Sequence, residues 1–438
     1  MANSANSSVS YVRTEMLPEQ APPVSEAGVV KWVRENLFSG PLNTILTILS
    51  LVAIYWVVSH VFQWFAYGIW TANSLSECRE VRDALYADGR NVACWAVLSE
   101  RWNQLLFGFY PADAYWRPVV ALIVFFIAVA PVMFNFGGRK LAIFSAVSPF
   151  ICYWLLWGGS IWGPILTALG FVLAWLAYGQ ITRQFGALAG VVASILVPLI
   201  YWRFGVAPLT GLADGILPIG IENIQSKDFG GFMLALIIGI TGIVLSLPLG
   251  ILLALGRQSD LFIINKFSVI FIEVIRGVPL IVWLFTASLL LNYFLPPGTN
   301  FDLMLRVIIM VTLFAAAYMA EVVRGGLAAL PRGQYEGADS LGLDYWQSMR
   351  LIILPQALKI SIPGIVNTFI GLFKDTTLVV FIGLLDPIGL SNAIRATTEW
   401  NGIYWELFIF IGLCFFVFCY AMSRYSQYLE RKLATDRH

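Results

Sequence analysis

The chain has 438 residues, of which 59% are hydrophobic and only 12% are charged, whereas a soluble domain carries about 25% charged residues. This composition excludes an ordinary soluble protein and indicates an all-α polytopic membrane protein embedded in a lipid bilayer. The formal net charge of +1 gives no electrostatic reason to expect nucleic-acid binding.

The first 40 residues begin with a mixture of Ser, Pro and Glu. Such a composition is typical of a disordered segment, so we predict a disordered tail over residues 1–40. The first apolar run begins near Leu42 and shows no clear cleavage site. We therefore expect an uncleaved first membrane helix rather than a signal peptide.

Ten apolar runs have the length of a membrane helix, which is about 20 residues for a hydrocarbon core about 30 Å thick. Five belong to a predicted N-terminal membrane extension over residues 41–215, and five to a predicted core over residues 229–431, with a boundary near Gly215. Between Leu141 and Trp202, glycines and Pro164 also permit a re-entrant element. The ten spans are Leu42–Ala66, Val119–Phe136, Leu141–Trp157, Ile161–Tyr178, Leu188–Trp202, Phe232–Leu255, Phe267–Leu295, Leu303–Val323, Ile362–Leu385 and Tyr404–Tyr425.

Two of the five cysteines, Cys78 and Cys94, share the polar loop 68–117. If that loop faces an oxidising compartment, a disulfide closing about 17 residues would contribute roughly 3 kcal/mol. The alternative is two unpaired thiols. The other cysteines lie in apolar runs, where a reduced thiol packs as a small hydrophobe. Without a CxxC pair or a histidine cluster, we predict no metal site.

A polar segment, Glu336–Pro355, interrupts the apolar second half. Pro331 and Gly333 are predicted to break the preceding helix, and Gln334–Leu341 to form two helical turns. Gly342 suits the C-terminal cap of this short helix. Further along, Asp344 and Gln347 are spaced as a capping box, and Pro355 can open another helix. Taken on these residues alone, the segment is better interpreted as a solvated amphipathic connector.

The order and spacing of Glu336, Ala338, Gly342 and Pro355 resemble the EAA loop of ABC importer permeases. The resemblance implies a short cytoplasmic helix, within a coupling loop over residues 325–361, that sits in a groove of a separate ATPase subunit. The residues to which it assigns ATPase coupling are Glu336, Gly337, Ala338, Asp339, Gly342 and Pro355.

Four further segments resemble the polar amino-acid permeases of ABC uptake systems. They are LSLPLGILLALGR with Pro248 and Gly250, FIEVIRGVPLIVWLF with Glu273 and Arg276, the AEVVRGG run with Tyr318, Glu321 and Arg324, and GLFKDTTLVVFIG with Lys374 and Asp375. This resemblance implies a five-helix type I importer core. The first half resembles, more weakly, the extension of the membrane subunits of general L-amino-acid transporters.

What the resemblance implies about partners is specific. It implies an ABC ATPase dimer that binds the ATP, and a periplasmic amino-acid-binding protein. Two core halves are needed around one pathway, so either a homodimer or a related second permease is possible. Resemblance to the general L-amino-acid systems implies a heterodimer. It also implies a broad range of L-amino acids and a location in the bacterial inner membrane. No segment matches the phosphate-binding G-x-x-x-x-G-K-[ST] loop, so we expect no cofactor in this chain itself.

Placing the coupling loop in the cytoplasm fixes the side of every other loop. Both termini then lie in the cytoplasm, and loop 68–117 lies in the periplasm. Arg139, Lys140, Arg183 and Arg257 fall inside, as the positive-inside rule expects. Loop 68–117 would be outside despite its arginines, but it is long and also acidic, which weakens the rule.

Ionisable groups in apolar spans indicate function or pairing, because a charge in the bilayer is costly. Lys374 and Asp375 point about 100 degrees apart on a helix, so we predict that each has a partner on another helix. Glu321 and Arg324 can pair at i, i+3. The structural or gating candidates are therefore Glu273, Arg276, Glu321, Arg324, Lys374 and Asp375. Polar residues that could line a substrate pathway, or merely bridge helices, are Thr241, Ser246, Asn292, Tyr318, Asn367 and Thr368.

Two other classes of function compete with an ABC permease. A secondary transporter driven by an ion gradient would also use ten spans and buried charges, but its two halves should show internal symmetry. Residues 1–215 contain no counterpart of the EAA segment or of the KDT segment. A membrane-embedded enzyme would need a catalytic set such as Ser and His or metal ligands, and the sequence offers none.

Overall fold

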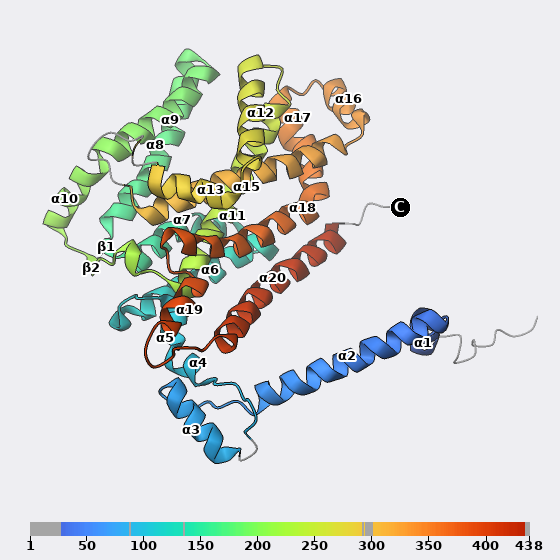
Figure 1. Cartoon of the computed structure of the whole chain (residues 1–438). Coiled ribbons are helices and arrows are strands. Elements are labelled where there is room, and N and C mark those ends of the chain that lie inside the picture. Colours follow the sequence, from blue (N-terminus) through green and yellow to red (C-terminus); the bar gives the residue numbers. More distant parts are fainter. Residues whose placement is uncertain (1–27, 87–88, 135, 291–292, 294–300, 434–438) are drawn as a thin grey trace, which may run out of the picture. The chain divides into compact units, whose positions relative to one another are not determined.

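The computed structural model describes residues 28–433 except 87–88, 135, 291–292 and 294–300 (Figure 1). The described chain forms two compact units. One comprises residues up to Ile69 with Arg82–Ala93, and the other Trp70–Val81 with the chain from Cys94 onward. The boundary predicted near Gly215 therefore lies inside the second unit.

The first unit contains α1 (Gly28–Asn36) and α2 (Pro41–Ala66). Pro41 stands in the first turn of α2, where its missing N–H removes no hydrogen bond. None of the residues of α2 is buried, and the helix is apolar all round, which suits contact with lipid. Nine residues of the predicted disordered tail are therefore helical in α1, and residues 1–27 lie outside the described part.

Helices of the N-terminal half follow in the second unit, after α3 (Leu75–Leu85), which crosses the boundary between the units. Gly158, with a positive φ, ends α7, and α8 begins four residues later. Thus full helices, not a re-entrant element, occupy the region between Leu141 and Trp202. The elements are α4 (Ala96–Glu100), α5 (Trp102–Phe107), α6 (Trp116–Phe134), α7 (Gly138–Trp157), α8 (Trp162–Phe185), α9 (Ala187–Phe204) and α10 (Val206–Ile216), with β1 (Gly159–Ser160) antiparallel to β2 (Gly220–Ile221).

The C-terminal half is built around α15 (Leu303–Ala328), which packs against α11 (Gly231–Arg257) and α18 (Leu354–Asp375). Glycines allow close approach: a Cβ on Gly250 would lie 2.6 Å from the Met319 side chain. α18 in turn packs against α20. The remaining elements are α12 (Phe262–Arg276), α13 (Leu280–Phe285), a π-helix (Thr286–Leu290), a 3-10 helix (Thr376–Ile382), α19 (Pro387–Arg395) and α20 (Trp405–Leu433).

One predicted span is wrong in shape. The sequence predicts a single helix over Phe267–Leu295, but the structure has α12 and α13, which are bent by 102° at residues 277–279. Pro279 cannot donate a backbone hydrogen bond, so it starts α13 instead of continuing α12. The span predicted over Ile362–Leu385 also ends early as an α-helix, at Asp375.

Within the described residues, nine helices are long and apolar enough to cross a membrane, or ten if α12 and α13 form one broken span. Almost all the regular structure is helical. The predicted fold class, an all-α membrane protein with about ten spans, is confirmed.

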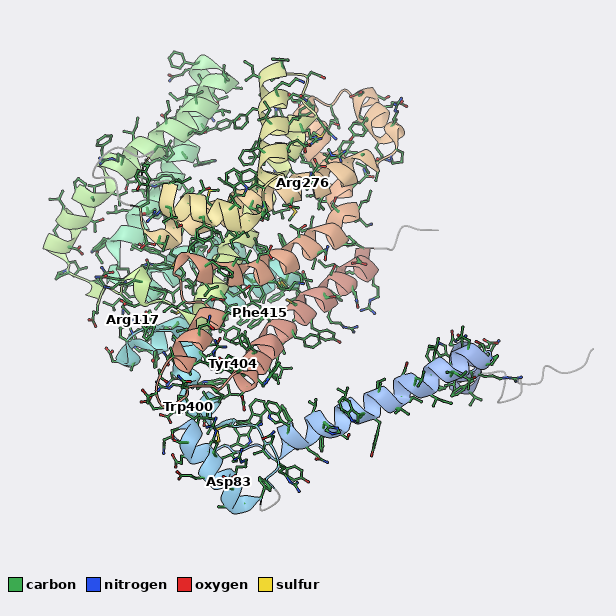
Figure 2. The ribbon with its side chains drawn as sticks, in the orientation of Figure 1. Asp83, Arg117, Arg276, Trp400, Tyr404 and Phe415 are labelled. Atoms are coloured by element: carbon green, nitrogen blue, oxygen red, sulfur yellow. A yellow bond between two sulfur atoms is a disulfide. The ribbon has the colours of Figure 1, made fainter. Side chains whose placement is uncertain are left out.

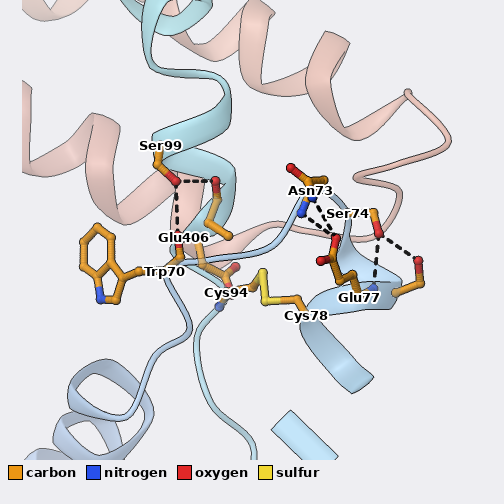
Figure 3. Close-up of a disulfide and its surroundings, with 10 residues drawn as sticks. Trp70, Asn73, Ser74, Glu77, Cys78, Cys94, Ser99 and Glu406 are labelled. Atoms are coloured by element: carbon orange, nitrogen blue, oxygen red, sulfur yellow. Dashed lines mark hydrogen bonds between the residues drawn. A yellow bond between two sulfur atoms is a disulfide. The ribbon is translucent and has the colours of Figure 1, made fainter. Parts of the chain in front are cut away.

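Cys78 and Cys94 form a disulfide in the second unit (Figure 3), with their Cα atoms 6.2 Å apart. Both cysteines are buried. The backbone N–H of Cys94 donates to Oε1 of the buried Glu406 at 2.9 Å, and the N–H of Leu75 donates to the carbonyl of Glu399 at 2.8 Å. The structure therefore contains the paired cysteines, and these contacts connect the bridged segment to α20 and to the loop that precedes it.

Candidate coupling and substrate-pathway sites

The predicted coupling helix is α16 (Arg332–Ser340), which begins after Pro331. Gly342 follows it with a φ of +68°. The N–H of Gly342 donates to the Asp339 carbonyl and the N–H of Leu343 to the Ala338 carbonyl, which is the Schellman pattern that ends a helix at glycine. The cap at Gly342 is as predicted, whereas Gly333 lies inside α16 and breaks no helix.

Beyond the glycine, the next turn begins with a capping box. The Asp344 carboxylate accepts from the Gln347 N–H at 2.8 Å, and the Gln347 side-chain carbonyl accepts from the Asp344 N–H at 3.1 Å. This box starts α17 (Tyr345–Ser348), and a π-helix (Met349–Ile353) leads into α18. Pro355 lies in the first turn of α18. The capping box and the proline start are confirmed.

Two contacts seat α16 on the membrane helices. Ala338 is fully buried, and the Gln356 side-chain amide of α18 donates to Oε1 of Gln334 at 2.9 Å. Glu336, Gly337 and Asp339 are exposed. The outer face of α16 is therefore acidic and free to meet another surface.

Sequence reasoning missed the apolar part of this surface. Leu341 is 72% exposed and Trp346 is 67% exposed. Exposed apolar groups beside charged ones are typical of a protein interaction site. The signal available in the sequence was two large apolar side chains in a polar segment, with Leu341 before the capping box and Trp346 inside it.

Three helices meet in an ion-pair cluster around Glu321 of α15. Glu321 Oε1 lies 2.7 Å from Arg257 Nη1, and Oε2 lies 2.9 Å from Arg324 Nη2 and 3.6 Å from Arg276 Nη1. Arg257 also pairs with Glu273 at 2.9 Å. The predicted i, i+3 pair of Glu321 and Arg324 is present, within a larger network. We call these five residues the Glu321 cluster.

Arg257 was not a sequence candidate. It ends α11, whereas Glu273 and Arg276 belong to the end of α12. The available signal was an arginine closing the first core helix, as another closes the second. Because the partners lie 16 and 64 residues away, only the folded helix packing brings them together.

A cavity of about 310 Å³ lies between α15 and α18. Three of the predicted pathway residues, Tyr318, Asn367 and Thr368, line it together with Asp375. The Arg276 guanidinium lies 5.3 Å from the centre of the Tyr318 ring, at the junction of α12 and α13 (Figure 2). The cavity therefore combines neutral hydrogen-bonding groups with one carboxylate.

The other polar candidates are placed elsewhere. Ser246 is fully buried and donates to the Ile243 carbonyl of its own helix. Thr241 does not line this cavity, and Asn292 lies outside the described residues. Lys374 is exposed, and over the described residues neither it nor Asp375 has an ion-pair partner on another helix. The predicted clamp between helices is therefore not present among the described residues, where Asp375 lines the cavity and Lys374 is exposed.

The chain matches known proteins along almost its whole length. It is 57% identical, over 98% of its residues and 99% of the relative, to the glutamate/glutamine/aspartate/asparagine transport system permease protein BztC of Rhodobacter capsulatus. The chain belongs to the amino-acid permeases of ABC transporters. The family profile "Binding-protein-dependent transport system inner membrane component" matches residues 246–435.

Two further relatives differ in how much of this chain they match. The inner membrane amino-acid ABC transporter permease protein YhdY of Escherichia coli is 38% identical over 93% of both chains. The glutamate/aspartate import permease protein GltK of Escherichia coli is 32% identical over 47% of this chain but 92% of its own length. The resemblance stated from the sequence is confirmed, and a gradient-driven secondary transporter is not supported.

Proposed function

We propose that this permease subunit carries the polar and acidic amino acids glutamate, glutamine, aspartate and asparagine. The 57% identical relative with the same overall length bears these four in its name. The cavity supports a substrate of this size, since about 310 Å³ is near the lower limit of small-molecule sites. One observation carries the proposal: the cavity lies between α15 and α18, and the coupling helix α16 lies between these two helices in the chain.

The cavity lining suits the shared part of an amino acid. Asp375 can pair with the α-ammonium group, while the Tyr318 hydroxyl and the Asn367 amide can donate to a carboxylate or a side-chain amide. Charged hydrogen bonds are the strong ones in such a site. Recognition of the shared backbone groups allows both the acid and the amide side chains of these four amino acids to be accepted.

α16 couples ATP hydrolysis to the cavity. In the proposed mechanism an ATPase dimer binds the exposed acidic and apolar face of α16, and closure of the dimer on ATP displaces that helix. α16 lies between α15 and α18 in the chain, and those two helices bear Tyr318 and Asp375. A displacement of α16 therefore changes the spacing of the cavity walls, which is what alternating access requires.

Similarity to binding-protein-dependent permeases supports two further partners. We propose that a second, related permease supplies the other half of the pathway and that a periplasmic binding protein delivers the amino acid. The chain lies in the bacterial inner membrane with both termini in the cytoplasm. The disulfide between Cys78 and Cys94 supports this placement, because disulfides persist in an oxidising compartment such as the bacterial periplasm.

The test is uptake by the complete complex in liposomes. Radiolabelled L-glutamate should enter on addition of ATP, and unlabelled glutamine, aspartate and asparagine should compete, whereas lysine and leucine should not. Equal competition by leucine would contradict the proposed substrate class. Asp375→Asn should raise the KM for uptake about tenfold or more while ATP hydrolysis persists, because a charged hydrogen bond to the ammonium group is lost.

A further inference from the structure

The Glu321 cluster contains three arginines and two glutamates, so its guanidinium groups compete for too few carboxylates. Glu321 holds Arg257 and Arg324 at 2.7 and 2.9 Å but Arg276 only at 3.6 Å. Among the described residues, the buried Nε of Arg276 has no hydrogen-bond partner. Arg276 is therefore the most weakly held member of the cluster.

Arg276 has a second contact, on the cavity side. Its guanidinium lies over the ring of Tyr318, and Tyr318 lines the cavity. Tyr318 and Glu321 are three residues apart on α15, so they lie on one face of that helix. The arginine thus stands between a cavity wall and the carboxylate at the centre of the cluster.

Arg276 lies at the bend between α12 and α13, where a small shift of its side chain can change how these helices are held. It is the last residue of α12, directly before the 102° bend into α13. Across the bend, Trp283 Nε1 donates to the Ile275 carbonyl at 3.1 Å. Among the described residues, a single ion pair joins α12 to α15, and it is the contact of Arg276 with Glu321.

We propose that Arg276 is a positioning residue that reports occupancy of the cavity to the Glu321 cluster. In the empty cavity it bridges α12 to α15 through Glu321. A substrate carboxylate beside Tyr318 attracts the guanidinium away from the distant Glu321 oxygen, and the link between α12 and α15 opens. This inference rests on the proposed function, since it needs an amino acid in the cavity and an ATPase that responds.

The experiment measures ATP hydrolysis by the complete complex in liposomes, with and without L-glutamate and its binding protein. Arg276→Gln should raise hydrolysis without substrate roughly fivefold, the lower end of an allosteric coupling, and should abolish the stimulation by glutamate. Arg276→Lys keeps the charge beside Glu321, so it should restore the low basal rate. A purely structural role would instead lower the basal and stimulated rates together.

Tyr318→Leu removes the ring but leaves the Glu321 cluster. It should weaken the stimulation by glutamate, and the double variant Arg276→Gln with Tyr318→Leu should behave as Arg276→Gln alone. The matched control is Lys266→Gln, which removes an exposed positive charge from α12 outside the cluster and should resemble the wild type.

Three outcomes would overturn the inference. They are an unchanged basal rate and stimulation in Arg276→Gln, independent multiplicative effects in the double variant, and an equal response of Lys266→Gln. If Arg276→Gln does not assemble, Arg276→Lys still tests the inference, because its glutamate concentration for half-maximal stimulation should rise. An unchanged concentration would reject it. Failure of the wild-type complex to take up any amino acid would reject the proposed function instead.

Discussion

Asp386 shows how a single buried group can make this fold sensitive to pH. Its side chain is fully buried, and Oδ1 accepts the Gly389 N–H at 2.8 Å, which caps the start of α19. Oδ2 has no hydrogen-bond partner among the described residues. Burial raises the pKa of Asp386 to about 6, although the backbone hydrogen bond from Gly389 opposes the rise.

The raised pKa fixes the direction of a stability change. Because the folded pKa exceeds the ordinary value, the unfolded chain releases this proton first as the pH rises. Stability is therefore lost between the unfolded pKa of 3.8 and the folded pKa of about 6 and stays lowered above it. Between pH 5 and 7.5 the loss is about 1 kcal/mol.

Asp386→Asn should remove this pH dependence while keeping the cap, since asparagine is as good an N-cap residue as aspartate. The measurement is thermal unfolding of the detergent-solubilised protein at pH 5 and 7.5. The difference between the two melting temperatures should shrink in the variant relative to the wild type. An identical difference in both proteins would show that Asp386 does not carry the effect.

Local signals in the sequence predicted individual residues well. Gly342 and Asp344 act on backbone groups within a few positions, so the sequence alone contains their partners. The roles of Asp375 and Arg257 could not be read in the same way. Which side of α18 faces a cavity, and which helix ends converge on Glu321, depend on packing between segments far apart in the chain.

At the scale of elements, α16 depends on the turn that ends it. Gly342 has a φ of +68°, so alanine there would cost about 1–2 kcal/mol of backbone strain. We predict that Gly342→Ala displaces α16 and lowers uptake roughly tenfold while ATP hydrolysis continues. The ratio of ATP hydrolysed to glutamate taken up measures this uncoupling.

Gly333→Ala is the matched control, because Gly333 lies inside α16 without a positive φ and nothing lies within 4 Å of an added Cβ. Its uptake should remain within about twofold of wild type, since alanine favours a helix. Normal coupling in Gly342→Ala, or equal uncoupling in both variants, would refute the importance of the turn.

The disulfide-closed segment is a second element with a measurable contribution. Replacing both Cys78 and Cys94 by serine should destabilise the protein by about 3 kcal/mol and lower its melting temperature. Cys419→Ala, which removes an unbridged cysteine, serves as control. A melting temperature unchanged by the double replacement would mean that the contacts of Cys94 with Glu406 and of Leu75 with Glu399 hold the segment unaided.

Element types and most spans followed from hydrophobic length, but the bend after α12 did not. An apolar run of sufficient length looks the same whether it is straight or broken, and Pro279 alone could also kink a continuous helix. The structure decides between these possibilities because Trp283 bonds back to Ile275 across the bend.

At the scale of the whole molecule, the cavity proposed to bind substrate and the helix proposed to dock the ATPase are neighbours in the chain. α15 and α18 bear the cavity residues, and α16 lies between these helices in the chain. The shorter relative GltK matches 47% of this chain over 92% of its own length, and the family profile matches residues 246–435. We therefore expect the C-terminal half to contain the parts that an ATP-driven cycle needs.

The most direct test of this account is the energy source for uptake. Liposomes containing the complete complex should accumulate L-glutamate on ATP even when ionophores abolish all ion gradients. Accumulation should stop when the partner ATPase is replaced by a variant unable to hydrolyse ATP. Uptake that persists without ATP hydrolysis and follows an imposed ion gradient would contradict the account.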